Sequence, residues 1–291
     1  MNKIQIMTDS ASDISVADEK RYNISVIPFP IIVDGKSYLS RVEIDNDKFF
    51  QLMAQSNDLP KTAQINAFQF VEIYYEQAQN GVEHLILVLI NSKGSSTYEN
   101  SVAAIKMFYE EHPEYKDKFF VHSIDGMGYN AIYGVPVLQA AEMRNNGATA
   151  DEIVNFLTET IPQREIFFGI YELKYAAKSG RIPTAAAFVG SVLNLKPIMR
   201  IFDGEIKTAA KCVGEKKLMK EMVEMTKKEM EPNTPYEIIY ARDRDCLEEF
   251  RQLIVEGLGY EPSAEFQTGA AVTANAGPRI VGISFIKRKD K

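Results

Sequence analysis

The sequence has few residues suited to metal or disulfide chemistry. It contains two cysteines, Cys212 and Cys246, in different segments and without the spacing of a metal site, so we expect free thiols in a reducing compartment. It contains three histidines, His84, His112 and His122, which do not form a metal-binding pattern such as a pair on one helix face. We therefore expect no metal site.

An excess of positive charge and long apolar runs are also missing. The chain carries 33 Lys and Arg against 40 Asp and Glu, which gives a net charge of −7 and a pI of about 5.2. Nucleic-acid binding needs a basic face to neutralise phosphates, so this balance argues against it, although a local basic patch would not show in the total. No apolar run approaches a membrane span, and the start, MNKIQIMTDSASD, has no apolar stretch long enough for a signal peptide. We expect a cytoplasmic protein with no integral membrane segment.

The motifs of nucleotide binding and of serine catalysis are absent as well. The sequence has neither a Gly-x-x-x-x-Gly-Lys-Ser/Thr loop nor a Gly-x-Gly-x-x-Gly fingerprint. No histidine accompanies its serines in a nucleophile elbow. We therefore expect no cofactor, no catalytic residues and a protein that is not itself an enzyme.

Length and composition favour two globular domains. At 291 residues the chain exceeds a usual single domain. With 45% hydrophobic and 25% charged residues it has the composition of an ordinary soluble protein with a substantial core.

The stretch from His84 to Phe108 combines a strand, a polar loop and a helix. Residues 85–90 form an unbroken apolar run, as in a strand buried on both faces. Ser96-Thr97-Tyr98-Glu99 fits a capping box, which would leave the hydroxyl of Ser95 free one residue upstream. A helix start carries unpaired N–H groups and roughly half a positive charge, so this site could hold a carboxylate or a phosphate. The alternative is that these serines only cap a helix and turn a loop.

Strands and helices alternate through the first half of the chain. This alternation indicates a largely parallel sheet with crossover helices, in which ligands sit beyond the carboxyl ends of the strands. The polar loops at 8–13, 60–66 and 91–96 therefore favour the ligand-binding interpretation of the serines. Two more capping boxes, Asn66 with Gln69 and Thr149 with Glu152, mark helix starts. We expect strands at 3–7, 85–90 and 119–121, an edge or irregular strand at 24–33, and helices around 49–55, after 66, after 96 and over 131–144.

The second half changes character after Pro162. The pair Asp203-Gly204 suits the tight turn of a hairpin between strands at 198–202 and 206–213. Strands at 166–171, 236–241 and 280–285 and helices at 172–178, 215–231 and 245–256 complete an α+β unit with a mixed or antiparallel sheet. We predict an N-terminal α/β domain over residues 1–162 and a C-terminal α+β domain over residues 163–291.

A series of short motifs runs along the chain in a specific order and spacing. They are Asp9-Ser10-Ala11-Ser12-Asp13, Lys61-Thr62-Ala63-Gln64, Ser95-Ser96-Thr97-Tyr98, Met127-Gly128, Leu173-Lys174-Tyr175, Gly180-Arg181-Ile182, Leu195-Lys196-Pro197-Ile198, Asp203-Gly204 and Gly277-Pro278. By these motifs the chain resembles the DegV family over nearly its whole length. The resemblance implies two α/β domains with one fatty acid between them, its tail buried and its carboxylate at the polar loops. Characterised family members are bacterial fatty acid-binding proteins that serve as the binding subunit of fatty acid kinase.

The resemblance also implies roles for individual residues. By position, Ser95 and Thr62 resemble the hydroxyl donors to the carboxylate, and the helix start at Ser96 and Thr97 resembles its backbone cradle. Arg181 matches a family arginine near the carboxylate end, which by resemblance also faces the kinase partner. The alternative for Arg181 is a cation placed near a helix C-terminus, where the helix dipole favours it.

The chain departs from the family pattern at the same end of the site. Asn275 stands where the family usually has a histidine that meets the carboxylate, so a titratable partner becomes a neutral amide. Ala63 replaces a usual serine, Ser96 a usual glycine, and Arg279 a residue that is generally glycine. One hypothesis is that Arg279 supplies the charge that the histidine would have given.

The leading functional prediction is a carrier that binds a long-chain fatty acid and presents its carboxylate to a separate ATP-dependent kinase, which makes acyl phosphate. Each buried methylene contributes roughly 0.8 kcal/mol, so an apolar tunnel needs few polar contacts. The alternative is a binding protein or enzyme for a small carboxylated or phosphorylated metabolite that uses the same anion-binding loops. A third possibility is a protein-interaction role with the lipid as a structural ligand. A long apolar cavity would favour the carrier, and a short polar pocket the metabolite.

Overall fold

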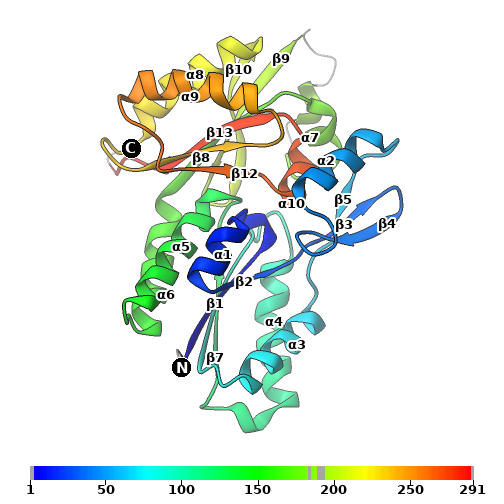
Figure 1. The fold of residues 1–291 in the computed structure, drawn as a ribbon, viewed down its shortest axis with the longest axis vertical. Coiled ribbons are helices and arrows are strands. Elements are labelled where there is room, and N and C mark those ends of the chain that lie inside the picture. The colour runs from blue at the N-terminus through cyan, green and yellow to red at the C-terminus, as the bar shows by residue number, and fades with distance from the viewer. Residues whose placement is uncertain (1–2, 183–184, 189–193, 290–291) are drawn as a thin grey trace.

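The computed structural model describes residues 3–182, 185–188 and 194–289. It is an α/β protein of two domains, one built on a parallel sheet and one on a mixed sheet, as predicted (Figure 1). The short helix η3 (Ile161–Gln163) leads from the last helix of the first part into the first strand of the mixed sheet. The exact boundary at residue 162 stays a prediction.

The first sheet is parallel throughout and has the strand order β2-β1-β6-β7. Its strands are β1 (Ile4–Asp9), β2 (Ile24–Ile27), β6 (His84–Leu89) and β7 (Phe120–Asp125). Residues 85–89 are completely buried, which confirms the strand predicted to be covered on both faces. Leu85, Leu87 and Leu89 point to one core, whereas Ile86 and Val88 point to another.

Helices cover both faces of this sheet. They are α1 (Val16–Tyr22), α3 (Ala67–Gln79), α4 (Thr97–Glu111), α5 (Ala131–Asn145) and α6 (Ala150–Thr160), with the short η1 (Ser10–Ser12) and η2 (Pro113–Tyr115). Helices α3 and α4 share a core with the leucines of β6, and α5 and α6 share the other core with Ile86. The capping boxes of Asn66 with Gln69 and of Thr149 with Glu152 are both present, as predicted.

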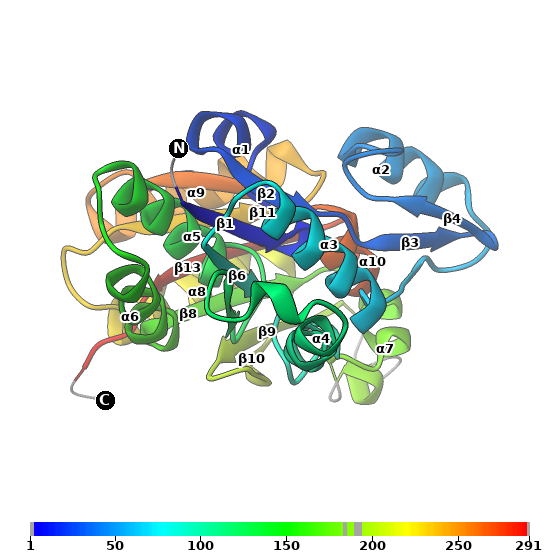
Figure 2. The same cartoon turned by 90° about the horizontal axis from the view of Figure 1, so that it is seen from below.

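A small antiparallel sheet, of order β4-β3-β5, lies at one side of the molecule beside α10 (Figures 1 and 2). It consists of β3 (Pro30–Val33), β4 (Lys36–Leu39) and β5 (Lys61–Thr62), with α2 (Asn46–Gln55) between β4 and β5. The single extended segment predicted at 24–33 is therefore two strands. Its first part, β2, is an edge strand, but β3 lies at the centre of the small sheet, so the edge prediction is wrong there. The chain can turn from one sheet into the other because Pro28 and Pro30 have no N–H to pair with a neighbouring strand.

The second sheet has six strands in the order β10-β9-β8-β13-β11-β12 and is antiparallel except for β11 with β12. Its strands are β8 (Arg164–Ile170), β9 (Leu195–Phe202), β10 (Glu205–Val213), β11 (Tyr236–Tyr240), β12 (Ala264–Gln267) and β13 (Ile280–Ile286). The hairpin between β9 and β10 is confirmed. Asp203 and Gly204 both have positive φ, 51° and 69°, as a tight hairpin turn requires.

The remaining helices belong to the second domain. They are α7 (Leu173–Ser179), α8 (Glu215–Glu229), α9 (Arg244–Leu258) and α10 (Ala270–Ala276), with the short η4 (Ala185–Phe188). Helices α8 and α9 cover one face of the mixed sheet. Leu218 and Met222 of α8 are buried there, and α8 itself confirms the helix predicted at 215–231. Strand β12 and helix α10 are additions to the predicted elements.

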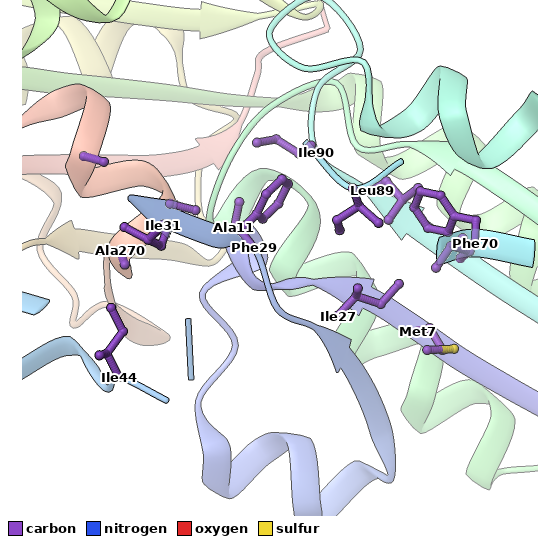
Figure 3. Close-up of a cluster of buried hydrophobic side chains, with 14 of the residues drawn as sticks. Met7, Ala11, Ile27, Phe29, Ile31, Ile44, Phe70, Leu89, Ile90 and Ala270 are labelled. Carbon is purple, nitrogen blue, oxygen red and sulfur yellow. The ribbon is translucent and has the colours of Figure 1, made fainter. Parts of the chain in front are cut away.

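The opposite face of the mixed sheet packs against the first domain. Ile132 and Val137 of α5 lie in one core with Ile166 and Phe168 of β8 and Ile201 of β9. A second core reaches from β1 and β6 through Phe29 and β3 to α10, as the labelled side chains in Figure 3 illustrate. The two domains are therefore joined by continuous apolar packing on both sides of the first sheet.

Candidate functional site

A cavity of about 750 Å³ lies where the two sheets, the small sheet and α10 meet. This volume is within the range of small-molecule sites, about 300 to 1,000 Å³. The residues that line it are Phe29, Thr62, Ala63, Gln64, Ile90, Ser92, Lys93, Gly94, Ser95, Ser96, Tyr129, Asn130, Ile166, Phe168, Gly180, Arg181, Ile182, Ile201, Ile206, Ile239, Thr268, Ala271, Val272, Asn275, Ala276 and Ile280.

One wall of the cavity is an aliphatic surface on the mixed sheet. Ile166, Ile201 and Ile206 are directly opposite one another on β8, β9 and β10, so they form one continuous row. In a neighbouring row, Phe168 and Ile239 flank Gly282 of β13. A Cβ on Gly282 would lie 2.6 Å from the Phe167 carbonyl oxygen and 2.8 Å from the Phe168 Cβ, so only glycine fits here. The wall offers apolar side chains along several strands and no charged group.

Another wall of the cavity carries polar groups from the loop after β6. Ser92, Ser95 and Ser96 line the cavity at the start of α4. The Asp125 carboxylate of β7 holds Ser92, because it accepts the Ser92 backbone N–H at 3.1 Å and its hydroxyl at 2.5 Å. This loop thus gathers hydroxyl groups at the carboxyl end of a central parallel strand, where the crevice rule places ligands.

The capping box predicted at Ser96 is not formed. Ser96 is the residue before α4, but its side chain accepts no capping hydrogen bond and is exposed. The Thr97 N–H instead donates to Ser95 Oγ at 3.3 Å. The reason is conformational: with φ −74° and ψ 13°, Ser96 lacks the extended backbone that a capping side chain normally requires. The oxygen of Ser95 is therefore engaged as a hydrogen-bond acceptor by the helix start, which differs from the wholly free hydroxyl that was predicted.

Thr97 does not line the cavity. Its side chain is completely buried beneath Ser95, and the two hydroxyl oxygens are 2.9 Å apart. Thr97 Oγ1 also accepts the backbone N–H of Ile65 at 3.3 Å, which ties the polar loop after β5 to the start of α4. The structure brings Thr97 close to the predicted site as a buried support of Ser95.

Thr62 and Asn275 line the same cavity from two other elements. Thr62 lies on β5, opposite Ile31 of β3. Asn275 lies on α10, and its amide donates one hydrogen bond to the Ala271 carbonyl oxygen at 2.9 Å. The second N–H of that amide has no acceptor among the described residues and can donate to a ligand. The structure thus gathers Thr62, Ser95, Ser96 and Asn275 around one space.

The two predicted arginines lie in different surroundings. Arg181 lines the cavity and is exposed, and its guanidinium donates to the Ser179 carbonyl oxygen at 2.8 Å, at the C-terminus of α7. Both interpretations of Arg181, as a helix-end cation and as a cavity residue, are compatible with this position. Arg279 is outside the lining. It forms ion pairs with Glu215 at 3.1 Å and Asp243 at 2.9 Å, so its charge is already matched and the head-group hypothesis for Arg279 is not supported.

The hairpin turn closes one side of the cavity against the polar loop. Asn91 Nδ2 donates to the Gly204 carbonyl oxygen at 2.9 Å, and Lys93 Nζ donates to that of Asp203 at 2.7 Å. The Gly204 N–H donates to the Met127 carbonyl oxygen at 3.1 Å. Because Ile201 and Ile206 flank this turn, the same contacts hold the end of the aliphatic wall next to the serines.

Several residues of the site were not predicted. Tyr129 and Asn130 follow β7, and Thr268 precedes α10; all three line the cavity. The Tyr129 hydroxyl is buried against Gly94, where a Cβ would overlap it, so the glycine of the serine loop makes room for the phenol. Burial raises the pKa of Tyr129, and the Asn91 side chain acts in the opposite direction. The signal for Tyr129 and Asn130 was their place between the predicted strand at 119–121 and the predicted helix at 131–144, and Thr268 had none.

Two buried carboxylates lie behind the polar wall. Asp9 accepts the Ile90 backbone N–H at 2.6 Å and the Tyr133 hydroxyl at 2.7 Å. Asp13 accepts from Asn130 Nδ2 at 2.6 Å and from the Gly269 N–H at 2.7 Å. Burial raises the pKa of Asp9 to about 6 and that of Asp13 to about 7. These side chains position the loops that line the cavity.

Neither a metal site nor a membrane span emerges from the described part of the chain. Among its residues, no three His, Cys, Asp or Glu side chains are grouped so that they could hold a metal ion. No helix within 3–182, 185–188 and 194–289 is both long and apolar enough to cross a membrane. Cys212 and Cys246 are both buried free thiols.

Comparison with known proteins identifies the family. A family model described as "Uncharacterised protein, DegV family" matches residues 3–288. The chain belongs to the DegV family. A DegV domain-containing protein from Caldanaerobacter subterraneus subsp. tengcongensis is 31% identical over 287 residues, which cover 98% of this chain and 99% of that protein.

Solved structures of other DegV-family proteins share the fold. A fatty acid-binding DegV family protein from Streptococcus agalactiae is 26% identical, with a TM-score of 0.84 over 98% of this chain and 99% of that one. A DegV family protein from Thermus thermophilus, described by its fatty acid binding, is 25% identical to this chain. Its TM-score is 0.84 over 98% of this chain and 99% of that one. These structures confirm the family and the two-domain fold predicted from the motifs.

Proposed function

We propose that this DegV-family protein is a carrier that holds one long-chain fatty acid in the cavity between its domains. The observation that carries the proposal is the pairing of an aliphatic wall on the mixed sheet with a hydroxyl and amide cluster at the start of α4. An acyl tail against Ile166, Ile201 and Ile206 would gain roughly 0.8 kcal/mol for each buried methylene. The fatty acid binding of the Streptococcus and Thermus proteins supports the same ligand class.

The carboxylate end is assigned to the polar wall. Ser95 and Thr62 contribute hydroxyl groups and Asn275 an amide N–H, all of which suit an acceptor-only carboxylate. The Ser96 side of the helix start lies beside them and adds the positive end of the α4 dipole. In this arrangement a neutral amide takes the place that the family usually gives to a histidine, and no proton transfer by the carrier is needed.

The carrier would present the bound carboxylate to a separate ATP-dependent fatty acid kinase, which forms the acyl phosphate. Arg181 is exposed at the rim of the cavity and is the residue proposed to face that partner. The chain itself would bind, shield and orient the lipid without making or breaking bonds.

Native mass spectrometry of the purified protein, followed by denaturation and identification of released small molecules, tests the ligand. We expect one fatty acid per chain. A protein that is empty and takes up no added fatty acid, but binds a short carboxylated or phosphorylated metabolite, would replace the carrier by the metabolite-binding alternative. Adding ATP and the catalytic subunit of a fatty acid kinase to the loaded protein, and trapping acyl phosphate with hydroxylamine, tests the hand-over separately.

A further inference from the structure

The hydrogen bonds around Ser95 fix the direction of its hydroxyl proton. Thr97 is completely buried, and two groups lie within hydrogen-bond distance of its Oγ1: the Ile65 N–H and Ser95 Oγ. The Ile65 N–H can only donate. Within the described part of the chain the Thr97 proton therefore has a single acceptor, Ser95 Oγ, and any other orientation would leave a buried O–H unpaired, which is costly.

Ser95 Oγ receives a second hydrogen bond, from the Thr97 backbone N–H at 3.3 Å. A serine hydroxyl has two acceptor lone pairs and one proton. Both lone pairs are thus occupied from the α4 side. Among the described residues the remaining O–H has no partner, and Ser95 itself lines the cavity, so this proton is free to point into it.

We propose that Thr97 is a positioning residue that forces Ser95 to act as a hydrogen-bond donor and so selects a negatively charged, acceptor-only head group. The inference rests on the proposed fatty acid function and deepens it. The Thr97 hydroxyl is the first member of a one-way chain: the Ile65 N–H donates to Thr97, Thr97 donates to Ser95, and Ser95 donates to the carboxylate. A charged acceptor strengthens the last bond, because hydrogen bonds to ionised groups are about twice as strong as neutral ones.

The test measures the binding of a fatty acid and of its methyl ester to three single variants and one double variant. Thr97→Val keeps the shape of the side chain and removes its hydroxyl, Thr97→Ser keeps the hydroxyl, and Ser95→Ala removes the final donor. We expect Thr97→Val to weaken fatty acid binding about tenfold but ester binding by less than about threefold, and Thr97→Ser to bind like the wild type.

The double variant Ser95→Ala/Thr97→Val decides whether Thr97 acts through Ser95. We expect its fatty acid affinity to match that of Ser95→Ala, because a residue that acts through another has no further effect once the other is gone. Equal losses for acid and ester in Thr97→Val, or additive losses in the double variant, would overturn the inference and leave a purely structural role. A wild-type protein that binds neither compound would instead refute the proposed function, so the two failures are distinguishable. Thermal unfolding of each variant checks that the variant is folded at the temperature of the binding measurement.

Discussion

The carboxylate of Asp13 accepts the backbone N–H of Gly269 at 2.7 Å, although the two residues are 256 positions apart in sequence. This bond joins the segment after β1 to the start of α10, which carries Asn275 into the cavity. The other oxygen of Asp13 holds the Asn130 amide, which also lines the cavity. One buried carboxylate therefore fixes two separate parts of the cavity wall.

Stability is expected to fall as the pH rises from about 4 to about 7. Burial raises the pKa of Asp13 from 3.8 to about 7 in the folded protein, so between these values the folded state binds more protons than the unfolded state. The stabilisation is complete below the unfolded pKa and is lost as the pH passes the folded one. Asp9, with a pKa of about 6, and Glu165, with a pKa of about 7, act in the same direction. His122, whose pKa is lowered, acts in the opposite direction below its ordinary value of 6.5.

Denaturant unfolding at pH 5, 6, 7 and 8 measures this dependence. Asp13→Asn should flatten the pH profile, and it should also lower stability at pH 5, because an amide NH₂ would then face one of two hydrogen-bond donors. The matched control is Asp47→Asn on the exposed surface of α2, which should leave the profile unchanged. A wild-type protein that becomes more stable from pH 5 to pH 7 would contradict the assignment.

Gly94→Ala should disturb the site through Tyr129. A Cβ at this position would overlap the Tyr129 hydroxyl, whereas the Tyr129 Cζ would be 3.2 Å away and could move by a few tenths of an ångström. We expect Gly94→Ala to cost about 1 to 3 kcal/mol of stability and to weaken fatty acid binding. Tyr129→Phe removes the overlapping oxygen, so the double variant should recover most of the loss. Thermal unfolding and fatty acid titration of the two single variants and the double variant check this. Equal damage with and without the Tyr129 hydroxyl would mean that Gly94 is needed for another reason.

The predictions from sequence succeeded where a local pattern determines the local structure. Asp203-Gly204 has the residues that a tight hairpin turn needs, and Asn66 with Gln69 forms its capping box within four residues. Ser96 offered the same capping pattern, but its backbone is not extended, and it ends a loop whose Asn91 is bonded to the hairpin turn, a contact that no local pattern reveals.

The parts of the site that sequence could not predict depend on tertiary packing. Helix α10 has the sequence AAVTANA, whose small side chains show no amphipathic period, yet it carries Asn275 to the cavity. The strands with Ile166 and Ile201 were predicted, but which of their faces meets α5 and the cavity follows from the register of six strands. The role of Asp13 arises from partners that are distant in sequence. The role of Thr97 arises from its burial beneath the polar wall.

If the cavity holds a fatty acid as proposed, a larger residue at Ile206 should shorten the acyl chain that fits it. Ile206 ends the row that starts at Ile166, and it lines the cavity next to the hairpin turn. Ile206→Phe should occupy space that the tail would fill, and each methylene that loses its contact costs about 0.8 kcal/mol, or roughly fourfold in affinity. Val213→Phe is the control, because Val213 lies on the same strand but is 56% exposed. Titration with a series of saturated fatty acids should show a preference for shorter chains in Ile206→Phe alone; an unchanged preference would place the tail elsewhere.

Arg279→Ala and Arg181→Ala should affect different properties of the protein. We expect Arg279→Ala to lower stability and leave fatty acid affinity unchanged. Arg279 bridges Glu215 of α8 and Asp243, which caps α9, so Arg279→Ala removes a link between two helices and β13. Because these ion pairs are partly exposed, we expect a loss of about 1 kcal/mol of stability. Fatty acid affinity should stay within about twofold of the wild type, since the Arg279 charge is matched outside the cavity.

Arg181→Ala should show the opposite pattern. The side chain is exposed and donates to the Ser179 carbonyl oxygen at the C-terminus of α7, so stability should change by less than about 0.5 kcal/mol. Transfer of phosphate to the bound fatty acid by an added kinase subunit should fall if Arg181 faces that partner as proposed. Denaturant unfolding, fatty acid titration and acyl phosphate trapping on both variants complete the comparison. A large loss of fatty acid affinity in Arg279→Ala would restore the hypothesis that Arg279 replaces the missing histidine. Unchanged phosphate transfer in Arg181→Ala would leave Arg181 only the role of a cation at the C-terminus of α7.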